Sequence, residues 1–144
     1  MSRMLGAVSR RPFLPKILVA FRALAERGKT PKDFGCPQPD PKPGHPDGWG
    51  IACVGEAEEV YRRGALQATA DPAYEDAVKA VARMANPPFL LLAHLRRSPR
   101  RDEIRTEFSH PFRRETANRL AFFAHDGALE GHGVRNGRTD SIAL

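Results

Sequence analysis

The 144-residue sequence predicts one domain of the α+β class, in which helices are combined with antiparallel strands. Short apolar runs bounded by turn residues are typical of strands. Two longer segments repeat apolar residues at steps of three and four, which predicts amphipathic helices. Two strand-like runs follow each other across a short polar turn, which predicts a hairpin. A chain of this length can bury a single core.

The first half begins with a predicted strand at 3–8, close to the amino terminus. An amphipathic helix is expected over Leu14–Arg27, and Gly28 ends it. Residues 29–47 contain six prolines, a density that neither a helix nor a central strand tolerates. We interpret this segment as a surface loop and not as a linker between two domains, because each flank is too short to form a domain alone.

The rest of the chain is expected to contain four strands and one complete helix. The strands are predicted at 48–54, 60–63, 89–95 and 119–125, the first two forming the hairpin. Asp71 and Pro72 match an N-cap and a first helical position, and the helix should end by Asn86. The unbroken apolar runs of the last two strands indicate cover on both faces. A further helix is expected to begin at Thr139.

The net charge of +6 raises the question of nucleic-acid binding, because clustered Lys and Arg can neutralise phosphates. The densest basic cluster lies at 96–105, with acidic residues mixed into it. We therefore favour a solvated, partly self-paired loop over a nucleic-acid site. The apolar runs are too short to cross a membrane and no signal-peptide core is present, so we expect a cytoplasmic protein.

The cysteines and histidines give no metal-site pattern. Cys36 and Cys53 lack a CxxC spacing, and we interpret the first as a free loop thiol and the second as a small buried residue. None of the five histidines forms an i, i+4 pair on a helix. We expect neither a metal nor another cofactor.

Several short blocks are more specific together than any of them is alone. In order they are Ser2–Gly6, His45–Ala52, Ala93–Arg96, His110–Phe112, Phe123–Leu129 and Thr139–Ser141. This series resembles class II glutamine amidotransferases of the small, stand-alone kind, which are N-terminal-nucleophile hydrolases. In that family a Cys follows the initiator Met, and the later blocks read DGWGIA, AHxR, HPF, AHNG and DSE. The resemblance covers essentially the whole chain.

The resemblance implies a four-layer αββα sandwich, in which two antiparallel sheets pack between helical layers. Family members of this kind usually continue well beyond the DSE block, so we expect this chain to hold the N-terminal part of the sandwich. The resemblance also implies a glutamine or related amino-acid ligand. A homo-oligomer or a partner subunit that completes the sandwich is a further possibility.

The chemistry of such a site follows from the position of its nucleophile. A side chain on the first residue has its own α-amino group beside it, which can act as general base near neutral pH. The resemblance makes Ser2 the nucleophile once Met1 is removed. Asp126 and Gly127 stand where the family has the Asn side chain and the Gly backbone of its oxyanion hole.

The resemblance also supplies residues for substrate binding. Arg96 would bind the substrate α-carboxylate, which a guanidinium fork suits, and Asp140 would bind the α-amino group. Trp49 and Gly50 would belong to the strand beside the nucleophile, where the glycine allows close backbone approach. Taken singly, each residue also has an ordinary structural interpretation, such as a basic loop for Arg96 or a turn for the Asp–Gly pair.

Two departures from the family pattern argue against ordinary turnover. Ser2 replaces the family Cys, and a hydroxyl needs stronger activation than a thiol to attack an amide. Asp126 replaces the Asn, and an ionised carboxylate accepts hydrogen bonds but donates none to an oxyanion. The sequence thus predicts a glutaminase-type domain with reduced or lost activity. Its alternatives are a non-catalytic amino-acid or γ-glutamyl binding module and one part of a split amidotransferase.

Overall fold

The protein has an α+β fold with two antiparallel sheets, which the computed structural model describes for residues 2–10, 13–36, 43–98, 100–117 and 119–127. The first sheet has the strand order β1 (Arg3–Ser9), β4 (Phe89–Leu95), β2 (Trp49–Val54) and β3 (Glu59–Gly64). The second pairs β5 (Phe112–Thr116) with β6 (Arg119–Phe123). The helices are α1 (Leu14–Arg22), α2 (Leu24–Arg27) and α3 (Pro72–Ala82). Short 3-10 turns are η1 (Pro31–Phe34), η2 (Arg101–Glu103) and η3 (Thr106–Phe108).

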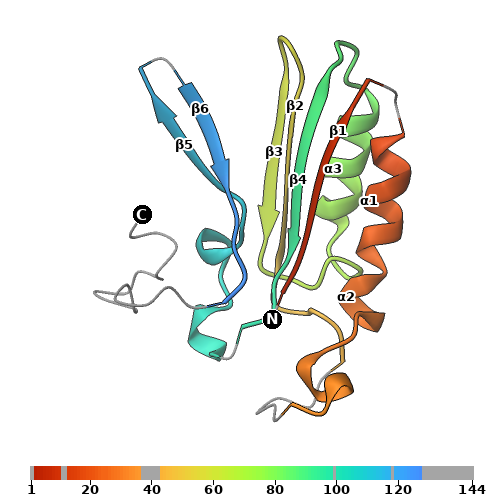
Figure 1. The fold of residues 1–144 in the computed structure, drawn as a ribbon, viewed down its shortest axis with the longest axis vertical. Helices are drawn as coiled ribbons and strands as arrows, with labels where there is room; N and C mark the ends of the chain where they lie inside the picture. Colours follow the sequence, from red (N-terminus) through yellow and green to blue (C-terminus); the bar gives the residue numbers. More distant parts are fainter. Residues whose placement is uncertain (1, 11–12, 37–42, 99, 118, 128–144) are drawn as a thin grey trace.

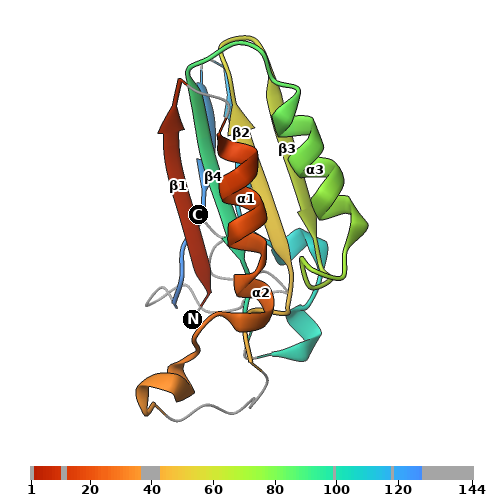
Figure 2. The ribbon, with the colours of Figure 1, turned by 90° about the vertical axis from the view of Figure 1, so that its right-hand side faces the viewer.

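The main core lies between the helices and one face of the first sheet. Helices α1 and α3 cover this face, and the β5–β6 hairpin lies on the other side (Figures 1 and 2). The buried residues include Leu18 of α1, Tyr74 of α3 and Ile51 of β2. Among the described residues, no helix combines the length and the apolar character needed to cross a bilayer.

Strand register determines which side chains share each face of the first sheet. Gly50 lies opposite His94 of β4, and His94 lies opposite Met4 of β1. Because side chains alternate along a strand, these three positions share the face toward the second sheet. Trp49 lies on the helix face, is 0% exposed, and donates through its indole N–H to Asp71 at 2.8 Å. Asp71 also accepts the Ala73 N–H at the start of α3, so one side chain links this helix to β2.

The second sheet covers the first only in part. Tyr61 of β3 packs on Phe122 of β6 at a ring distance of 5.4 Å. Farther from the amino terminus, an apolar groove of about 530 Å³ separates the two sheets. Val8 and Leu90 beside it remain 72% and 54% exposed. The sheets therefore meet most closely at the end of the molecule where β1 begins (Figure 1).

Most predicted elements are confirmed, with shifted ends. The first strand, the hairpin, the helix capped by Asp71 and the strand at 89–95 all occur. The helix expected over Leu14–Arg27 is instead two helices that meet at Ala23, whose N–H donates to the carbonyls of Ala20 and Phe21. The expected loop contains η1, and the helix predicted from Thr139 lies outside the described residues.

Two expectations about strands were wrong, and one strand was missed. Strand β5 was not predicted at all. Strand β6 is mostly exposed and not covered on both faces, because within the described residues it belongs to a two-stranded sheet that packs only partly on the first sheet. Strand β2 is not directly beside the nucleophile strand, because β4 lies between β1 and β2.

Candidate active site

Ser2 lies at the end of the first sheet, next to the segment that follows β4. Because Arg3 pairs with Leu95 in antiparallel register, the residue before β1 must meet the residues after β4. The Ser2 hydroxyl accepts a hydrogen bond from the Arg97 backbone N–H at 3.2 Å, and Ser2 is buried. A backbone donor therefore already faces the predicted nucleophile.

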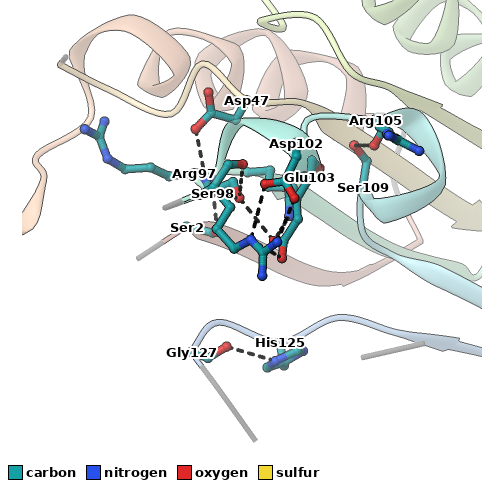
Figure 3. A network of polar contacts seen from close by, with 12 residues as sticks. Ser2, Asp47, Arg97, Ser98, Asp102, Glu103, Arg105, Ser109, His125 and Gly127 are labelled. Carbon is teal, nitrogen blue, oxygen red and sulfur yellow. Dashed lines mark hydrogen bonds and ion pairs between the residues drawn. The ribbon is translucent and has the colours of Figure 1, made fainter. Parts of the chain in front are cut away.

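Asp126 comes from the second sheet and reaches the same point. It follows β6, and its Oδ1 accepts a hydrogen bond from the Ser2 backbone N–H at 2.6 Å. The next residue, Gly127, has φ +117°, a conformation that favours glycine, and its carbonyl lies 3.1 Å from the His125 Nε2. Figure 3 shows His125 and Gly127 on the chain that passes across from Ser2. The structure thus brings both predicted catalytic segments together.

The guanidinium of Arg96 faces Glu103 and is buried. Its Nη1 donates to the Glu103 carbonyl at 2.7 Å, and its Nη2 lies 3.3 Å from Glu103 Oε2. Burial lowers the pKa of Arg96, while the carboxylates of Glu103 and Asp47 oppose that effect. Arg96, the predicted carboxylate-binding residue, directly precedes Arg97, whose N–H contacts Ser2. Its guanidinium, however, is hydrogen-bonded to Glu103, a residue that the sequence analysis did not identify.

The loop before β2 is tied to the same segment by a second carboxylate. Asp47 Oδ2 accepts the Ser98 N–H at 2.8 Å, and the Asp47 N–H donates to the Arg96 carbonyl at 3.1 Å. The side chain of Arg97 donates to the Gly44 carbonyl at 2.6 Å. These bonds hold residues 44–48 against residues 96–98 and so fix the backbone donor at Ser2. We did not assign Asp47 a role from the sequence, although it stands in the DGWG block.

Gly50 and Trp49 have separate structural roles. A Cβ on Gly50 would overlap the His110 carbonyl oxygen, so the glycine allows the segment before β5 to approach the first sheet. This is the close backbone approach predicted for the glycine. The Trp49 side chain points away from Ser2 into the helix-side core, so in this structure it supports β2 and does not line the space beside Ser2.

Four histidines lie near this end of the sheets. His94 and His110 are in ring contact at 4.7 Å, and His110 also contacts His125 at 5.2 Å. Within the described ranges, neither ring nitrogen of His94 or of His45 has a hydrogen-bond partner. Burial lowers the pKa of His94 far below its ordinary value and that of His45 to about 4, with Arg3 and Arg97 adding to the effect at His45. Both rings are therefore neutral at pH 7.

The buried His45 predicts a loss of stability in acid. Its pKa is about 4 in the folded chain against an ordinary 6.5, so between these values the unfolded chain binds a proton that the folded chain does not. The free energy of unfolding is therefore not reduced by His45 above about pH 7, and it decreases as the pH falls toward 4 because the unfolded chain gains the proton. We expect this residue to account for about 2–3 kcal/mol between pH 7.5 and 4.5.

Urea unfolding at several pH values measures this effect in the wild type and in His45→Gln, which cannot be protonated in this range. The difference in unfolding free energy between the two proteins should decrease from pH 7.5 to 4.5. Other groups, His94 included, titrate in both proteins and cancel in the difference. A difference that stays constant with pH would show that His45 is not buried as a neutral ring.

Asp140, the predicted partner of the substrate α-amino group, lies outside the described residues, as does the rest of the Thr139–Ser141 block. The structure therefore brings together Ser2, Asp126 and Gly127 and places Arg96 beside them. Asp47 and Glu103 also lie near Ser2 (Figure 3), and His45 is close enough to Arg97 and Asp126 for their charges to act on its ring. A hydroxyl with its own backbone nitrogen beside it, a backbone N–H donor and a buried cation are groups that acyl transfer can use, once that nitrogen is a free amine.

Comparison with known proteins gives one family match. The family model of class II glutamine amidotransferases matches residues 1–142, nearly the whole chain. A search of curated proteins and a search of solved structures gave no match. The blocks around Ser2, Trp49, Arg96 and Asp126 all lie inside the matched range. On the extent of this match, the chain belongs to the class II glutamine amidotransferase family.

Proposed function

We propose that this chain is a glutamine-binding amidotransferase domain whose parent reaction is hydrolysis of the glutamine side-chain amide by Ser2, with turnover strongly reduced by Asp126. The observation that carries the proposal is the position of Ser2, whose hydroxyl meets the Arg97 N–H while its nitrogen meets Asp126. We further propose the four-layer αββα sandwich, which is supported by helices on one face of the first sheet and the β5–β6 hairpin on the other (Figure 2).

The reaction requires removal of Met1, which makes the Ser2 nitrogen a free α-amine. The Ser2 hydroxyl attacks the side-chain carbonyl carbon of glutamine, and its proton passes to that amine. The proton then moves to the departing nitrogen, which leaves as ammonia. Water hydrolyses the γ-glutamyl ester, releasing glutamate and restoring the hydroxyl. Arg96 binds the substrate α-carboxylate and Asp140 its α-ammonium in this proposal.

Asp126 opposes this sequence at two points. Its carboxylate lies 2.6 Å from the nitrogen that must act as base, and an opposite charge at that distance stabilises the protonated amine. It also provides no N–H donor where the family has an amide for the oxyanion. Both effects slow the hydrolysis of any glutamine that the domain binds.

The test is ammonia release from glutamine by the purified chain and by the variant Ser2→Cys, Asp126→Asn, with mass spectrometry to verify the loss of Met1. We expect the double variant to release ammonia and Ser2→Ala, Asp126→Asn to release none. If the processed double variant neither binds glutamine nor releases ammonia, the site assignment is wrong.

A second candidate is a non-catalytic amino-acid or γ-glutamyl binding module. The contact between Asp126 and the Ser2 nitrogen favours it, since it disables the base and leaves the remaining contacts intact. Calorimetry with glutamine and glutamate distinguishes the two. Binding without any ammonia release by the wild type indicates the module, and slow release indicates the enzyme.

A further inference from the structure

Arg96 is enclosed by the short segment that carries Glu103. Its Nη1 and Nη2 both point to this one residue, to the main-chain carbonyl at 2.7 Å and to Oε2 at 3.3 Å. The two side chains are only 8% and 12% exposed. The guanidinium that would receive an α-carboxylate therefore already has a carboxylate oxygen of the chain at Nη2 and a main-chain carbonyl at Nη1.

Glu103 is held in this place by more than Arg96. Its Oε2 accepts the Ser98 hydroxyl at 3.4 Å, and its Oε1 lies 3.3 Å from the Arg100 Nε. The residue ends the turn η2, where its N–H donates to the Arg100 carbonyl. Figure 3 shows Glu103, Ser98 and Ser2 together at this end of the first sheet. The carboxylate is thus fixed by two cations and a hydroxyl.

A ligand carboxylate cannot share this position without cost. Each terminal nitrogen of Arg96 already donates to Glu103, so a ligand carboxylate would have to bind the remaining N–H groups directly beside the Glu103 carboxylate. A second carboxylate beside Glu103 would place two negative charges in contact in a buried site, where water screens them little. A neutral group at the same position meets no such repulsion.

We infer that Glu103 is a specificity-determining residue that occupies the carboxylate position of Arg96 and so disfavours ligands with a free α-carboxylate. The inference rests on the proposed function, because it takes Arg96 as the group that meets the substrate backbone. Glutamine then binds only when the Glu103 side chain leaves the guanidinium. A γ-glutamyl compound whose α-carboxylate is blocked as an amide needs no such movement.

The same segment offers a matched control. Glu107 lies four residues farther along, is exposed, and its Oε1 lies 3.9 Å from the Arg105 Nη1. Its replacement by Gln removes the same charge without a contact to Arg96 among the described residues. An effect of net charge alone would therefore appear in both Glu103→Gln and Glu107→Gln.

The experiment is calorimetry of glutamine and of glutaminamide, whose α-carboxylate is an amide, with proteins that carry Ser2→Ala so that no acyl-enzyme forms. Glu103→Gln should bind glutamine at least about tenfold more tightly than its parent, since like charges in contact weaken binding. Its affinity for glutaminamide should stay within about twofold, and Glu107→Gln should change neither affinity. Circular dichroism checks that each variant is folded.

The outcomes separate this inference from the proposed function. Equal glutamine affinity in parent and Glu103→Gln overturns the role of Glu103 and leaves the pocket in place. An equal gain for both ligands overturns it as well, because general loosening of the site does not depend on the ligand carboxylate. If no folded variant binds glutamine, and the double variant Ser2→Cys, Asp126→Asn releases no ammonia, the proposed function itself fails.

Discussion

Ser2→Cys alone is expected to leave glutamine hydrolysis at least about 100-fold slower than the pair Ser2→Cys, Asp126→Asn, because one lost oxyanion donor costs about 2.7–4 kcal/mol in a well-studied protease. The single change supplies a better nucleophile but keeps the carboxylate 2.6 Å from the nitrogen of residue 2. That carboxylate still raises the pKa of the α-amine. The Asn restores a donor and removes this charge together.

Steady-state ammonia release across pH measures the effect. In proteins that keep Asp126 the rate should rise only at higher pH, where the amine has lost its proton, and Asp126→Asn should move this rise to lower pH. Asp76→Asn, on the exposed side of α3, is the control for loss of a carboxylate far from Ser2. Similar rates and similar pH profiles for the single and double variants would show that Asp126 does not govern the base.

Gly50→Ala is expected to destabilise the fold and to separate the two sheets at the site. Its Cβ would overlap the His110 carbonyl group, and the backbone must move because this group is main chain and the next neighbour is the rigid ring of Pro111. Overpacking of this kind costs about 1–3 kcal/mol. Since His110 leads into the hairpin that carries Asp126, the displacement should also break the contact to Ser2. Urea unfolding measures the stability.

Gly6→Ala provides the comparison within the same sheet and on the same face. Nothing lies within 4 Å of a Cβ at Gly6, so this change should be neutral or stabilising by about 0.5–1 kcal/mol. Calorimetry of glutamine should detect loss of binding in Gly50→Ala only. If both glycine variants unfold at the same urea concentration, close approach at Gly50 is not a constraint.

The strands with a buried face could be predicted because their apolar pattern reports that burial. Strand β4 is a continuous apolar run, and β1 and β2 follow the same rule. Strand β5 has charged residues at three successive positions, Arg113, Arg114 and Glu115, so its sequence carries no such pattern. Its pairing with β6 makes it a strand, and pairing across a hairpin is not visible in local hydropathy.

The candidate site could be predicted only in part. Ser2, Arg96 and Asp126 could be identified because each stands in a short motif block, and the blocks occur in the same order as in the family. The partner of Arg96 could not be predicted, because Glu103 is reached through an irregular loop whose turns follow no period. Asp140 remains a prediction, since it lies outside the described residues.

The pairing of Arg3 with Leu95 has a consequence for how this chemistry can change. A slip of one residue between β1 and β4 would turn every side chain of β1 to the opposite face and point the second residue into the helix-side core. The direction in which the Ser2 hydroxyl points therefore depends on the apolar spacing of the entire strand β1. An insertion or deletion within β1 that shifted this register would remove the contacts of Ser2 with Arg97 and Asp126 without replacing any of the three residues.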